Sequence, residues 1–435
     1  FQLSKKYGPV YSIQMGTQKV VMLCGYETLK EALVNNADEF SGRGKVPIFD
    51  ELSNGHGVVF ANGENWKVMR RFSLSTLRDY GMGKKSLEDK INEESDALTE
   101  KLESYKGQPL ENTMIMNAAV SNIIVSILLD DRFDYEDPVL LRLITIMNEN
   151  IRLMGSPMIM LYNTYPSLIR WIPGIHKTIK KNMKEFYDFL KETFAKHKEH
   201  LDVNDQRNLI DAFLVKQQEE KPIPGQYFNN ENLLHLVGDL FGAGMETTST
   251  TLRWGFLFML KYPEIQKKVQ NEIEKVIGSA QPQMEHRKKM PYTDAVIHEI
   301  QRFGNIVPAS VPREVTQDVT LKGYFLPKGT SVFPVLASAL QDKDYFEKPD
   351  EFYPEHFLDS EGNFIKNDAF MPFSAGRRVC AGENLAKMEL FLFFTRLLQK
   401  FTFQLPSGVS DVDISPAVGL TRGPKPYLMC AVSRN

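Results

Sequence analysis

A single apolar stretch in the middle of the chain constrains the fold most. From Asn229 to Lys261 the apolar residues recur with helical spacing, behind an Asn that suits a helix start and ahead of Pro263, which ends it. Its centre, FGAGMETTSTT, suits a plain structural helix poorly, because Gly242 and Gly244 each cost about 1 kcal/mol against alanine and the threonines compete for backbone hydrogen bonds. We therefore expect either a close-approaching ligand, with a local widening of the helix that frees Thr247, or a packing contact through small residues.

The rest of the chain is predicted to be mostly helical with a minor sheet content. Helical periodicity covers residues 26–35, 64–129 with breaks, 139–153, 177–200 and 207–218. Short strands are predicted at residues 10–15 and 19–24, and a hairpin-like stretch begins at Leu321, with turns at Gly323 and at Lys328–Gly329. Residues 42–61 are predicted to form a long irregular loop, which suits binding better than packing. The fold class is therefore mainly α.

Composition limits the class of protein. The chain has 435 residues, 42% of them hydrophobic, enough for one large core or two ordinary domains. Its formal net charge is −3, and no basic cluster is long enough to indicate nucleic-acid binding. Three cysteines without a C-x-x-C pair argue against a disulfide scaffold or a structural zinc site. No run of 18 apolar residues occurs, so no membrane span is expected, and the opening FQLSKKYG suggests a chain cut at its front.

A turn rich in glycine and arginine holds Cys380 just before a second apolar helix. Residues 373–382 are FSAGRRVCAG, and the next eighteen have helical period. A cysteine at a helix start, beside cations and backbone N–H groups, is in a setting that favours the thiolate. A buried thiolate needs a positive partner; the Arg378 guanidinium is one candidate and a haem iron is a better one. Gly376 would let the loop turn beneath a flat cofactor where a Cβ would collide. The alternative is an inert core thiol.

The ten residues of this turn resemble the haem-binding signature of the cytochrome P450 superfamily at Phe373, Gly376, Arg378, Cys380 and Gly382. The stretch Ala243–Thr248 likewise resembles the oxygen-binding signature of that family. The resemblance spans essentially residues 1–435 and is closest to the vertebrate microsomal family-two type. It implies a single catalytic domain, a multihelical triangular prism with small β-sheets, and one haem b between the long central helix and the cysteine-bearing loop. It also implies that the membrane anchor is missing from the front of the chain.

The same resemblance assigns roles to individual residues. Cys380 would be the axial ligand of the haem iron, and Glu246 and Thr247 would supply protons during oxygen activation. Glu299 and Arg302 would form the family's buried E-x-x-R pair, with His356 in the place of the usual arginine partner. Haem contacts are implied for Cys380, Arg378, Trp66, Arg70, Arg43, Arg313, Phe373, Gly376, Ala243 and Gly382, the arginines neutralising the two propionates and the Trp66 indole donating an N–H.

The substrate pocket is carried over by position alone. Its expected lining is Val46, Ile48, Phe49, Phe60, Phe241, Ala243, Thr247, Ile306, Val307, Ala309, Val311 and Leu420. Each of these residues could equally be ordinary core. Their apolar character favours lipophilic substrates such as fatty acids, steroids or xenobiotics.

Partners follow from what the chain lacks. It has no flavin or nicotinamide fingerprint, so electrons from NADPH are expected to arrive through NADPH–cytochrome P450 reductase, with cytochrome b5 a second possible donor. Basic residues near the thiolate side could form the docking patch or be an ordinary solvated surface: Lys67, Arg71, Lys84, Lys85, Arg377 and Lys387. The apolar segment 158–176 is either a buried connector or a lobe that dips into the cytoplasmic face of the endoplasmic reticulum membrane.

Two other functions fit the same residues less well. One is a haem-thiolate enzyme that rearranges peroxides without using dioxygen, against which the Glu246–Thr247 pair argues. The other is a non-catalytic haem- or lipid-binding protein of helical type.

Overall fold

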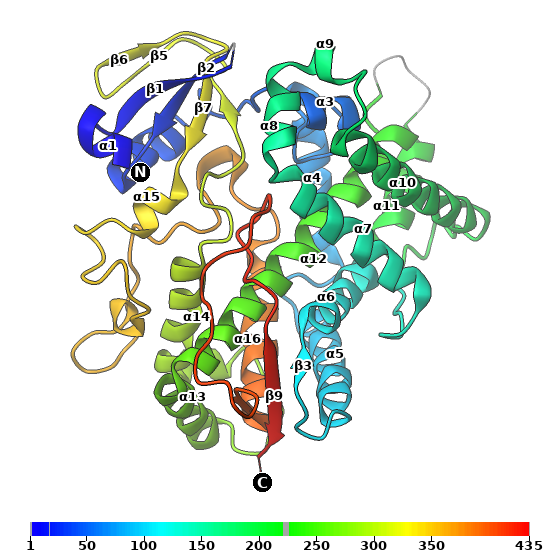
Figure 1. Ribbon diagram of the computed structural model, residues 1–435. Helices are drawn as coiled ribbons and strands as arrows, with labels where there is room; N and C mark the ends of the chain where they lie inside the picture. The colour runs from blue at the N-terminus through cyan, green and yellow to red at the C-terminus, as the bar shows by residue number, and fades with distance from the viewer. Residues whose placement is uncertain (1, 17, 221–225, 435) are drawn as a thin grey trace.

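The computed structural model describes residues 2–16, 18–220 and 226–434, and it is built around the long helix predicted from the sequence (Figure 1). Helix α12, Asn230–Lys261, runs through the middle of the molecule, and the Asn229 side chain caps it by accepting a hydrogen bond from the backbone of Asn232. It ends at Tyr262, ahead of Pro263. The prediction of this helix is confirmed.

Three helices make the most extensive contacts with α12: α6 (Thr113–Leu128), α14 (Pro291–Gly304) and α16 (Glu383–Lys400). The approach of α6 explains one of the two unusual glycines, because a Cβ on Gly244 would lie 2.5 Å from Cδ1 of Ile124. A Cβ on Gly242 would meet only Met147, at 3.8 Å. The packing interpretation therefore holds for Gly244.

The remaining long helices surround this centre. They are α4 (Gly63–Asp79), α5 (Lys85–Glu103), α7 (Pro138–Met154), α10 (Ile175–Glu199), α11 (Leu209–Glu219) and α13 (Pro263–Val276). The helical stretches predicted at 64–129, 139–153, 177–200 and 207–218 are confirmed, with breaks after Asp79 and Glu103. The helix predicted at 26–35 is α2 (Tyr26–Lys30) followed by one π-turn, η1 (Glu31–Asn35).

Short helices lie in two further segments, and the first of them differs from the prediction. The stretch predicted as an irregular loop, 42–61, contains a helix, α3 (Pro47–Ser53), because Pro47 stands at the first helical position, where its missing N–H costs nothing. The segment 158–176 forms two short helices, α8 (Pro157–Thr164) and α9 (Pro166–Ile169), each also started by a proline. In all three of these helices a proline stands at the first helical position.

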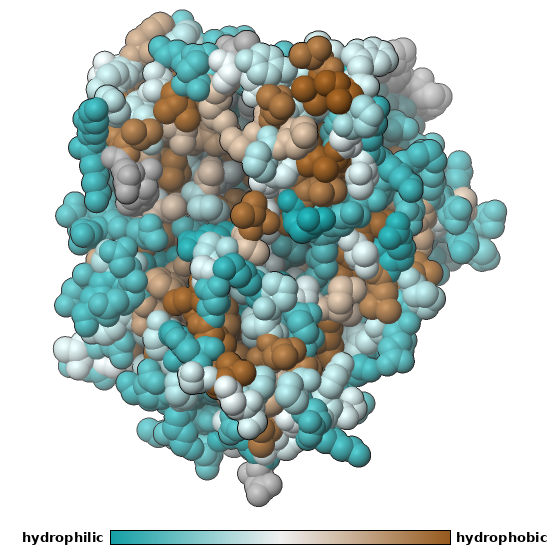
Figure 2. Space-filling model, in the orientation of Figure 1, coloured by the Kyte–Doolittle hydropathy of each residue, from teal (hydrophilic) through white to brown (hydrophobic). Residues whose placement is uncertain are grey.

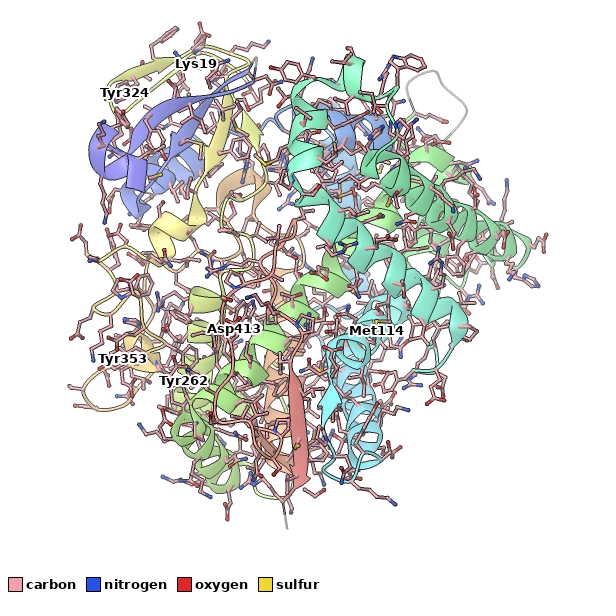
Figure 3. All side chains as sticks on the ribbon, viewed as in Figure 1. Lys19, Met114, Tyr262, Tyr324, Tyr353 and Asp413 are labelled. Carbon is pink, nitrogen blue, oxygen red and sulfur yellow. The ribbon has the colours of Figure 1, made fainter. Side chains whose placement is uncertain are left out.

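The sheets are small and lie mainly to one side of the helices (Figure 1). The largest has the order β1-β2-β7-β4, formed by Val10–Met15, Gln18–Leu23, Ser331–Pro334 and Arg313–Glu314. Strands β5 (Val319–Leu321) and β6 (Tyr324–Leu326) form the predicted hairpin, with Tyr324 at its outer edge (Figure 3). The next strand, β7, leaves the hairpin after the Gly329 turn and pairs in parallel with β2, Val20 opposite Ser331. A third sheet orders β3, β9 and β8 (Leu110–Glu111, Leu428–Ser433 and Phe401–Gln404).

Among the helices of the described ranges, none combines the length and apolar character needed to cross a bilayer.

Candidate cofactor and oxygen site

The cysteine loop is held by its own backbone and by a distant turn. Cys380 N–H donates to the Phe373 carbonyl over 3.0 Å, and the Gly382 N–H donates to the Cys380 sulfur, one residue before α16 begins. Gly376 has a φ of +74°, and a Cβ there would lie 1.7 Å from the carbonyl oxygen of Leu33 in η1. The predicted collision at Gly376 is therefore with protein backbone; the conformation and the close approach both require glycine.

The protein alone does not favour the Cys380 thiolate. The Cys380 side chain is exposed at its edge, but the protein around it desolvates the sulfur. This desolvation raises the pKa of Cys380. The Gly382 N–H and the charge of Arg70 lower the pKa by less. Arg378, expected as one possible counter-charge, points elsewhere: it donates to the carbonyls of Ser41 and Ala61. A cation bound directly at the sulfur would reverse this balance, which is what a metal does to a coordinating thiol.

Four arginines gather near this loop without a carboxylate partner. Arg43, Arg313 and Arg378 are buried and Arg70 is half-buried, and none of the four forms an ion pair within the described ranges. Burial, with repulsion from neighbouring guanidinium groups, lowers the pKa of Arg378 to about 9, and burial with the charge of Arg70 lowers that of Arg313 to about 10. Burying several like charges is costly unless an anion neutralises them. The cluster is therefore built to hold an anion.

Three buried donors in the same place have no hydrogen-bond partner among the described residues: Trp66 Nε1, Arg313 Nε and Arg378 Nη1. An unsatisfied buried donor costs about 1–3 kcal/mol, so these atoms call for acceptors that the polypeptide does not supply. Two carboxylates would satisfy them and offset part of the guanidinium charge. The residues present thus fit haem, whose propionates are two such carboxylates and whose iron takes a thiolate ligand.

Backbone carbonyls and one amide orient the arginines. Arg70 donates to the Val379 carbonyl, next to Cys380, over 2.7 Å, and Arg43 Nε donates to the carbonyl of Val59 over 2.8 Å. Asn62, which was not predicted from the sequence, accepts from both the Arg43 backbone and the Arg378 side chain, at 2.8 and 3.2 Å. A polar residue just before the start of α4 was the only signal for it.

Asp239 is a second residue that was missed. It is partly buried on α12, and its Oδ2 accepts from the backbones of Val58 and Val59 at 2.8 and 2.9 Å. Desolvation raises its pKa to about 6 against the opposing effect of these bonds and of Arg43. The loop between α3 and α4 is thus hydrogen-bonded both to α12, through Asp239, and to the arginine cluster, through Arg43 and Arg378.

One face of α12 is open at Ala243 and Thr247, which lie one turn apart, while most of the helix is buried. The helix is regular α across this stretch, and Thr247 Oγ1 donates to the carbonyl of Ala243 over 2.7 Å. The predicted local widening of the helix is therefore wrong: the hydroxyl bonds backward along its own helix, as threonine does inside helices.

Glu246, next to Thr247, is buried. Its Oε1 accepts from Thr421 Oγ1 at 2.7 Å and from Thr250 Oγ1 at 3.1 Å. Burial raises the pKa of Glu246, partly offset by these two hydroxyls and by Arg253. A carboxyl whose pKa is raised by burial beside an open stretch of helix is suited to holding and passing a proton. Thr421 comes from the C-terminal segment and carried no sequence signal.

A further buried carboxyl joins α12 to the helix after the cysteine. Glu389 on α16 accepts from Thr248 Oγ1 over 3.0 Å, while its Oε1 has no partner in the described part of the chain. Complete burial raises its pKa to about 8, so this side chain is neutral at pH 7. A lone glutamate within the apolar run MELFLFF was the available signal.

The predicted E-x-x-R pair is buried and fully bonded. Arg302 donates to both carboxylate oxygens of Glu299 at 2.6 and 2.7 Å, and to three backbone carbonyls besides. His356 Nδ1 lies 3.2 Å from Glu299 Oε2, and its Nε2 accepts from the Lys348 backbone over 3.1 Å. Because Nε2 accepts, Nδ1 is the nitrogen that carries hydrogen and donates to Glu299. His356 therefore does join Glu299 through an imidazole N–H, as the sequence allowed.

The predicted pocket residues fall into three groups by burial. Ile48 and Phe241 are buried in packed clusters, Ile48 with no exposed surface, so Ile48 belongs to the core rather than to a pocket wall. Ala243, Ala309 and Leu420 border accessible space, and partial burial is shared by Val46, Phe49, Phe60, Thr247, Ile306, Val307 and Val311. The rings of Phe49 and Phe60 stack at 4.1 Å. The Val311 carbonyl accepts a hydrogen bond from Arg43 Nη1, and the Ile306 carbonyl accepts one from the Arg422 backbone N–H.

The segment 158–176 is partly buried and partly exposed. Ile159, Tyr162 and His176 pack inward, whereas Met158, Met160, Leu161, Tyr165, Leu168, Trp171 and Ile172 are exposed, Trp171 to 79%. Hydrophobic atoms gather over this part of the surface (Figure 2). Neither alternative from the sequence holds alone, since the segment both packs on the body and presents an apolar surface.

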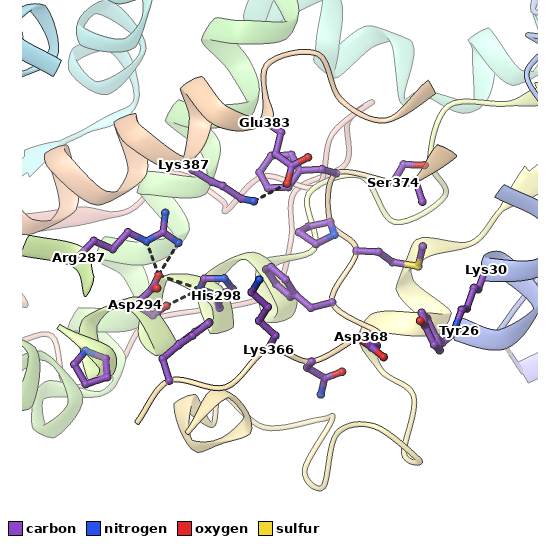
Figure 4. A pocket seen from close by; sticks show the side chains of 18 of the residues that line it. Tyr26, Lys30, Arg287, Asp294, His298, Lys366, Asp368, Ser374, Glu383 and Lys387 are labelled. Atoms are coloured by element: carbon purple, nitrogen blue, oxygen red, sulfur yellow. Dashed lines mark hydrogen bonds and ion pairs between the residues drawn. The ribbon is translucent and has the colours of Figure 1, made fainter. Parts of the chain in front are cut away.

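A groove of about 1100 Å³ runs along the cysteine loop (Figure 4). It contains Lys387 of the predicted basic patch, together with Lys30, Arg287, Lys288 and Lys366. Four of the six predicted patch residues already pair with acids: Lys67 with Glu64, Lys85 with Glu88, Arg377 with Asp38 and Lys387 with Glu383. These pairs reduce the positive charge of the patch but leave Arg71 and Lys84 outside any ion pair with the described acids, Lys84 donating to the Asp79 carbonyl instead.

Comparison with known proteins gives consistent matches. The family model described as Cytochrome P450 matches residues 1–431. Cytochrome P450 2K6 of Danio rerio is 52% identical over all of this chain and 86% of its own length. Cytochrome P450 2B19 of Mus musculus is 47% identical over all of this chain and 88% of its own length, and Cytochrome P450 2C5 of Oryctolagus cuniculus is 48% identical over 99% and 88%.

Proposed function

Because the chain belongs to the cytochrome P450 family and is a haem-thiolate monooxygenase, we propose that it oxidises lipophilic small molecules such as fatty acids, steroids or xenobiotics. Haem bound through a thiolate supplies the oxygen chemistry, since sulfur donation assists O–O cleavage. The protein supplies binding, orientation and protons. The observation that carries the cofactor assignment is the cluster of buried arginines and unpaired donors near Cys380.

The reduced carbon monoxide spectrum tests the cofactor assignment. A strongly red-shifted Soret band is expected for the purified holoprotein and should be lost in Cys380→Ser. Cys430→Ser is the matched control, because that buried thiol lies in strand β9. A band that survives in Cys380→Ser would contradict the ligand assignment.

Glu246 and Thr247 are assigned the supply of protons during oxygen activation. Thr247 lies on the open face of α12, and the buried Glu246 beside it holds a raised pKa. Thr247→Ala and Glu246→Gln are expected to divert electrons from NADPH into peroxide rather than product, by about tenfold or more, since general acid catalysis contributes at least that much. Product formed per NADPH consumed is the measurement. NADPH-dependent oxygen uptake by the wild type also separates this function from peroxide rearrangement, which needs no dioxygen.

NADPH–cytochrome P450 reductase, and secondarily cytochrome b5, are assigned as electron donors at the basic face. Neutralising Lys67 and Arg71 together is expected to slow reductase-driven turnover while sparing peroxide-driven turnover. Neutralising Lys196 and Lys198 on α10 is the control for charge alone. Equal loss in both assays would defeat this docking assignment.

The apolar surface of α8, α9 and the following turn is assigned to the cytoplasmic face of the endoplasmic reticulum membrane. Leu168→Ala with Trp171→Ala should weaken cosedimentation with neutral phospholipid vesicles, because both side chains are highly exposed. Tyr324→Ala with Phe325→Ala on the β5–β6 hairpin removes an exposed aromatic pair elsewhere. Loss of binding only in the hairpin variant would overturn the assignment.

A further inference from the structure

The carboxyl of Glu246 is held in an asymmetric way. Both hydroxyl donors, Thr421 Oγ1 and Thr250 Oγ1, point to the same oxygen, Oε1. The other oxygen, Oε2, accepts no hydrogen bond from the described residues. An oxygen that accepts two hydroxyl protons is a poor place for a third, so a proton on this carboxyl resides on Oε2.

The two donors are not equivalent. Thr250 lies one turn further along α12, so it moves with Glu246 and cannot place that side chain relative to the rest of the site. Thr421 lies 175 residues away in the sequence, in the C-terminal segment, and makes the shorter bond. Thr421 is therefore the contact that fixes Glu246 against a separate part of the fold.

Thr421 itself is held on both sides. The backbone N–H of Leu420 donates to the Ile151 carbonyl over 2.9 Å, and that of Arg422 donates to the Ile306 carbonyl over 2.8 Å. The Trp254 indole, one turn beyond Thr250 on α12, donates to the Arg422 carbonyl over 2.8 Å. With both neighbours anchored, the Thr421 hydroxyl has a defined position, and it is framed by two residues expected to line the pocket, Ile306 and Leu420.

We propose that Thr421 is a positioning residue for proton supply: its hydroxyl fixes Oε1 of Glu246 as the accepting oxygen and leaves the proton on Oε2, free to pass to the open face of α12. This inference rests on the proposed role of Glu246 and Thr247 and adds the residue that orients the acid. No bond to the substrate or cofactor is involved, so Thr421 acts through Glu246 alone.

The charge balance gives a second readout. Arg253 is the charged group that acts on Glu246, and burial outweighs it together with the two hydroxyls. The Thr421 hydroxyl stabilises the carboxylate form, so its removal raises the pKa of Glu246 further. A residue with only a structural role would not move this titration.

The experiment compares Thr421→Val, which keeps the shape and removes the donor, with Thr421→Ser, which keeps the donor. In the reconstituted holoenzyme we expect Thr421→Val to lower the product formed per NADPH by about three- to tenfold, as the loss of a hydrogen bond to a carboxylate allows. The pH dependence of this coupling, the product formed per NADPH, should shift to higher pH. The infrared carboxyl band that is assigned to Glu246 by its loss in Glu246→Gln should also titrate at higher pH. Thr421→Ser retains the hydrogen bond, so it should restore the product formed per NADPH to within about twofold of wild type. The carboxyl band should then titrate at the same pH as in wild type.

Controls separate the failure modes. Ser415→Ala removes a hydroxyl from the same segment that pairs with Asp413, and it should leave coupling and titration unchanged. Wild-type coupling and titration in Thr421→Val, while Glu246→Gln and Thr247→Ala are uncoupled, would overturn this inference and leave the proposed function standing. Coupling that is unchanged in Glu246→Gln and Thr247→Ala would remove the proposed proton role and this inference with it. If Thr421→Val yields no folded holoprotein, the infrared titration of Thr421→Ala decides by the same criterion.

Discussion

The guanidinium carbon of Arg378 lies 3.7 Å from the centre of the Trp66 indole ring. A desolvated cation over an indole face contributes on the order of 2 kcal/mol, and both side chains here are buried. Each side chain of the stack has a buried donor without a partner in the described chain, Arg378 Nη1 and Trp66 Nε1. The two donors therefore form one recognition element for an anion.

We expect Arg378→Lys to lose haem although the charge is kept, because lysine has neither the planar fork nor the stacking surface of arginine. The haem content of the purified protein should fall severalfold, and the rate of haem transfer to apomyoglobin should rise. Arg377→Lys is the matched control, since its neighbour Arg377 is exposed and pairs with Asp38. Equal retention of haem in both variants would contradict the recognition element.

Gly376→Ala should prevent assembly of the cysteine loop. Its left-handed backbone costs an alanine about 1 kcal/mol, and the clash with the Leu33 carbonyl adds about 1–3 kcal/mol more. Gly362→Ala isolates the first cost, because Gly362 has a φ of +83° with no atom within 4 Å of the added Cβ. Thermal midpoints of the two variants give the comparison; similar midpoints would show that the Leu33 contact does not matter.

The sequence indicated the parts of the site that depend on local spacing. Glu299 and Arg302 are three residues apart on one helix, so their pairing followed from helical geometry, and the structure confirms it. The break in helix quality at residues 241–251 likewise marked the stretch that carries Thr247. The cysteine turn was visible because its glycines and arginines are adjacent in the chain.

What the sequence did not indicate are contacts between distant segments. Thr421 reaches Glu246 across 175 positions, and Asp239 reaches the backbone of Val58 across 181. Neither contact leaves a repeating pattern of residues in the sequence, because each joins one side chain to one position on a distant segment. The pKa of Cys380 in the protein alone could not be read from the sequence for a related reason: the Gly382 N–H is local, but the burial that raises this pKa and the Arg70 charge that lowers it come from distant parts of the chain.

Asp239 is expected to control the loop between α3 and α4. Asp239→Asn can keep both bonds, because Val58 and Val59 donate to the same oxygen, whereas Asp239→Leu leaves two partly buried N–H groups unpaired. Asp239→Leu should therefore lose about 2–6 kcal/mol of local stability, measured as hydrogen exchange at Val58 and Val59. If Asp239→Asn exposes these amides as strongly as Asp239→Leu, the charge rather than the hydrogen bonds holds the loop.

The same aspartate gives a pH dependence with a defined sign. Its pKa is raised from 3.8 to about 6 in the folded state, so between about pH 4 and pH 6 the native protein binds more protons than the unfolded chain. Stability from this group is present below pH 4 and is lost as pH rises through 6. Between pH 4 and pH 6 the thermal midpoint of Asp239→Asn should fall less than that of wild type. If the thermal midpoints of both proteins change equally with pH, Asp239 does not titrate in this range.

Glu389 predicts a second window at higher pH. Its pKa is raised to about 8 by burial, so the native state keeps its proton while the unfolded chain releases it near 4.5. Stability is therefore lost as pH rises from about 4.5 through 8, because above 8 a charge is forced between α12 and α16 with one hydroxyl for a partner. Glu389→Gln keeps an acceptor for Thr248 and removes the charge.

Between pH 6.5 and pH 9 the thermal midpoint of wild type should fall by several degrees more than the thermal midpoint of Glu389→Gln. A change of a few kcal/mol gives a shift of that size in a chain of this length. Thr248→Val should steepen the fall, since it removes the hydroxyl that stabilises the carboxylate, and parallel curves for all three proteins would show that Glu389 does not titrate in this range.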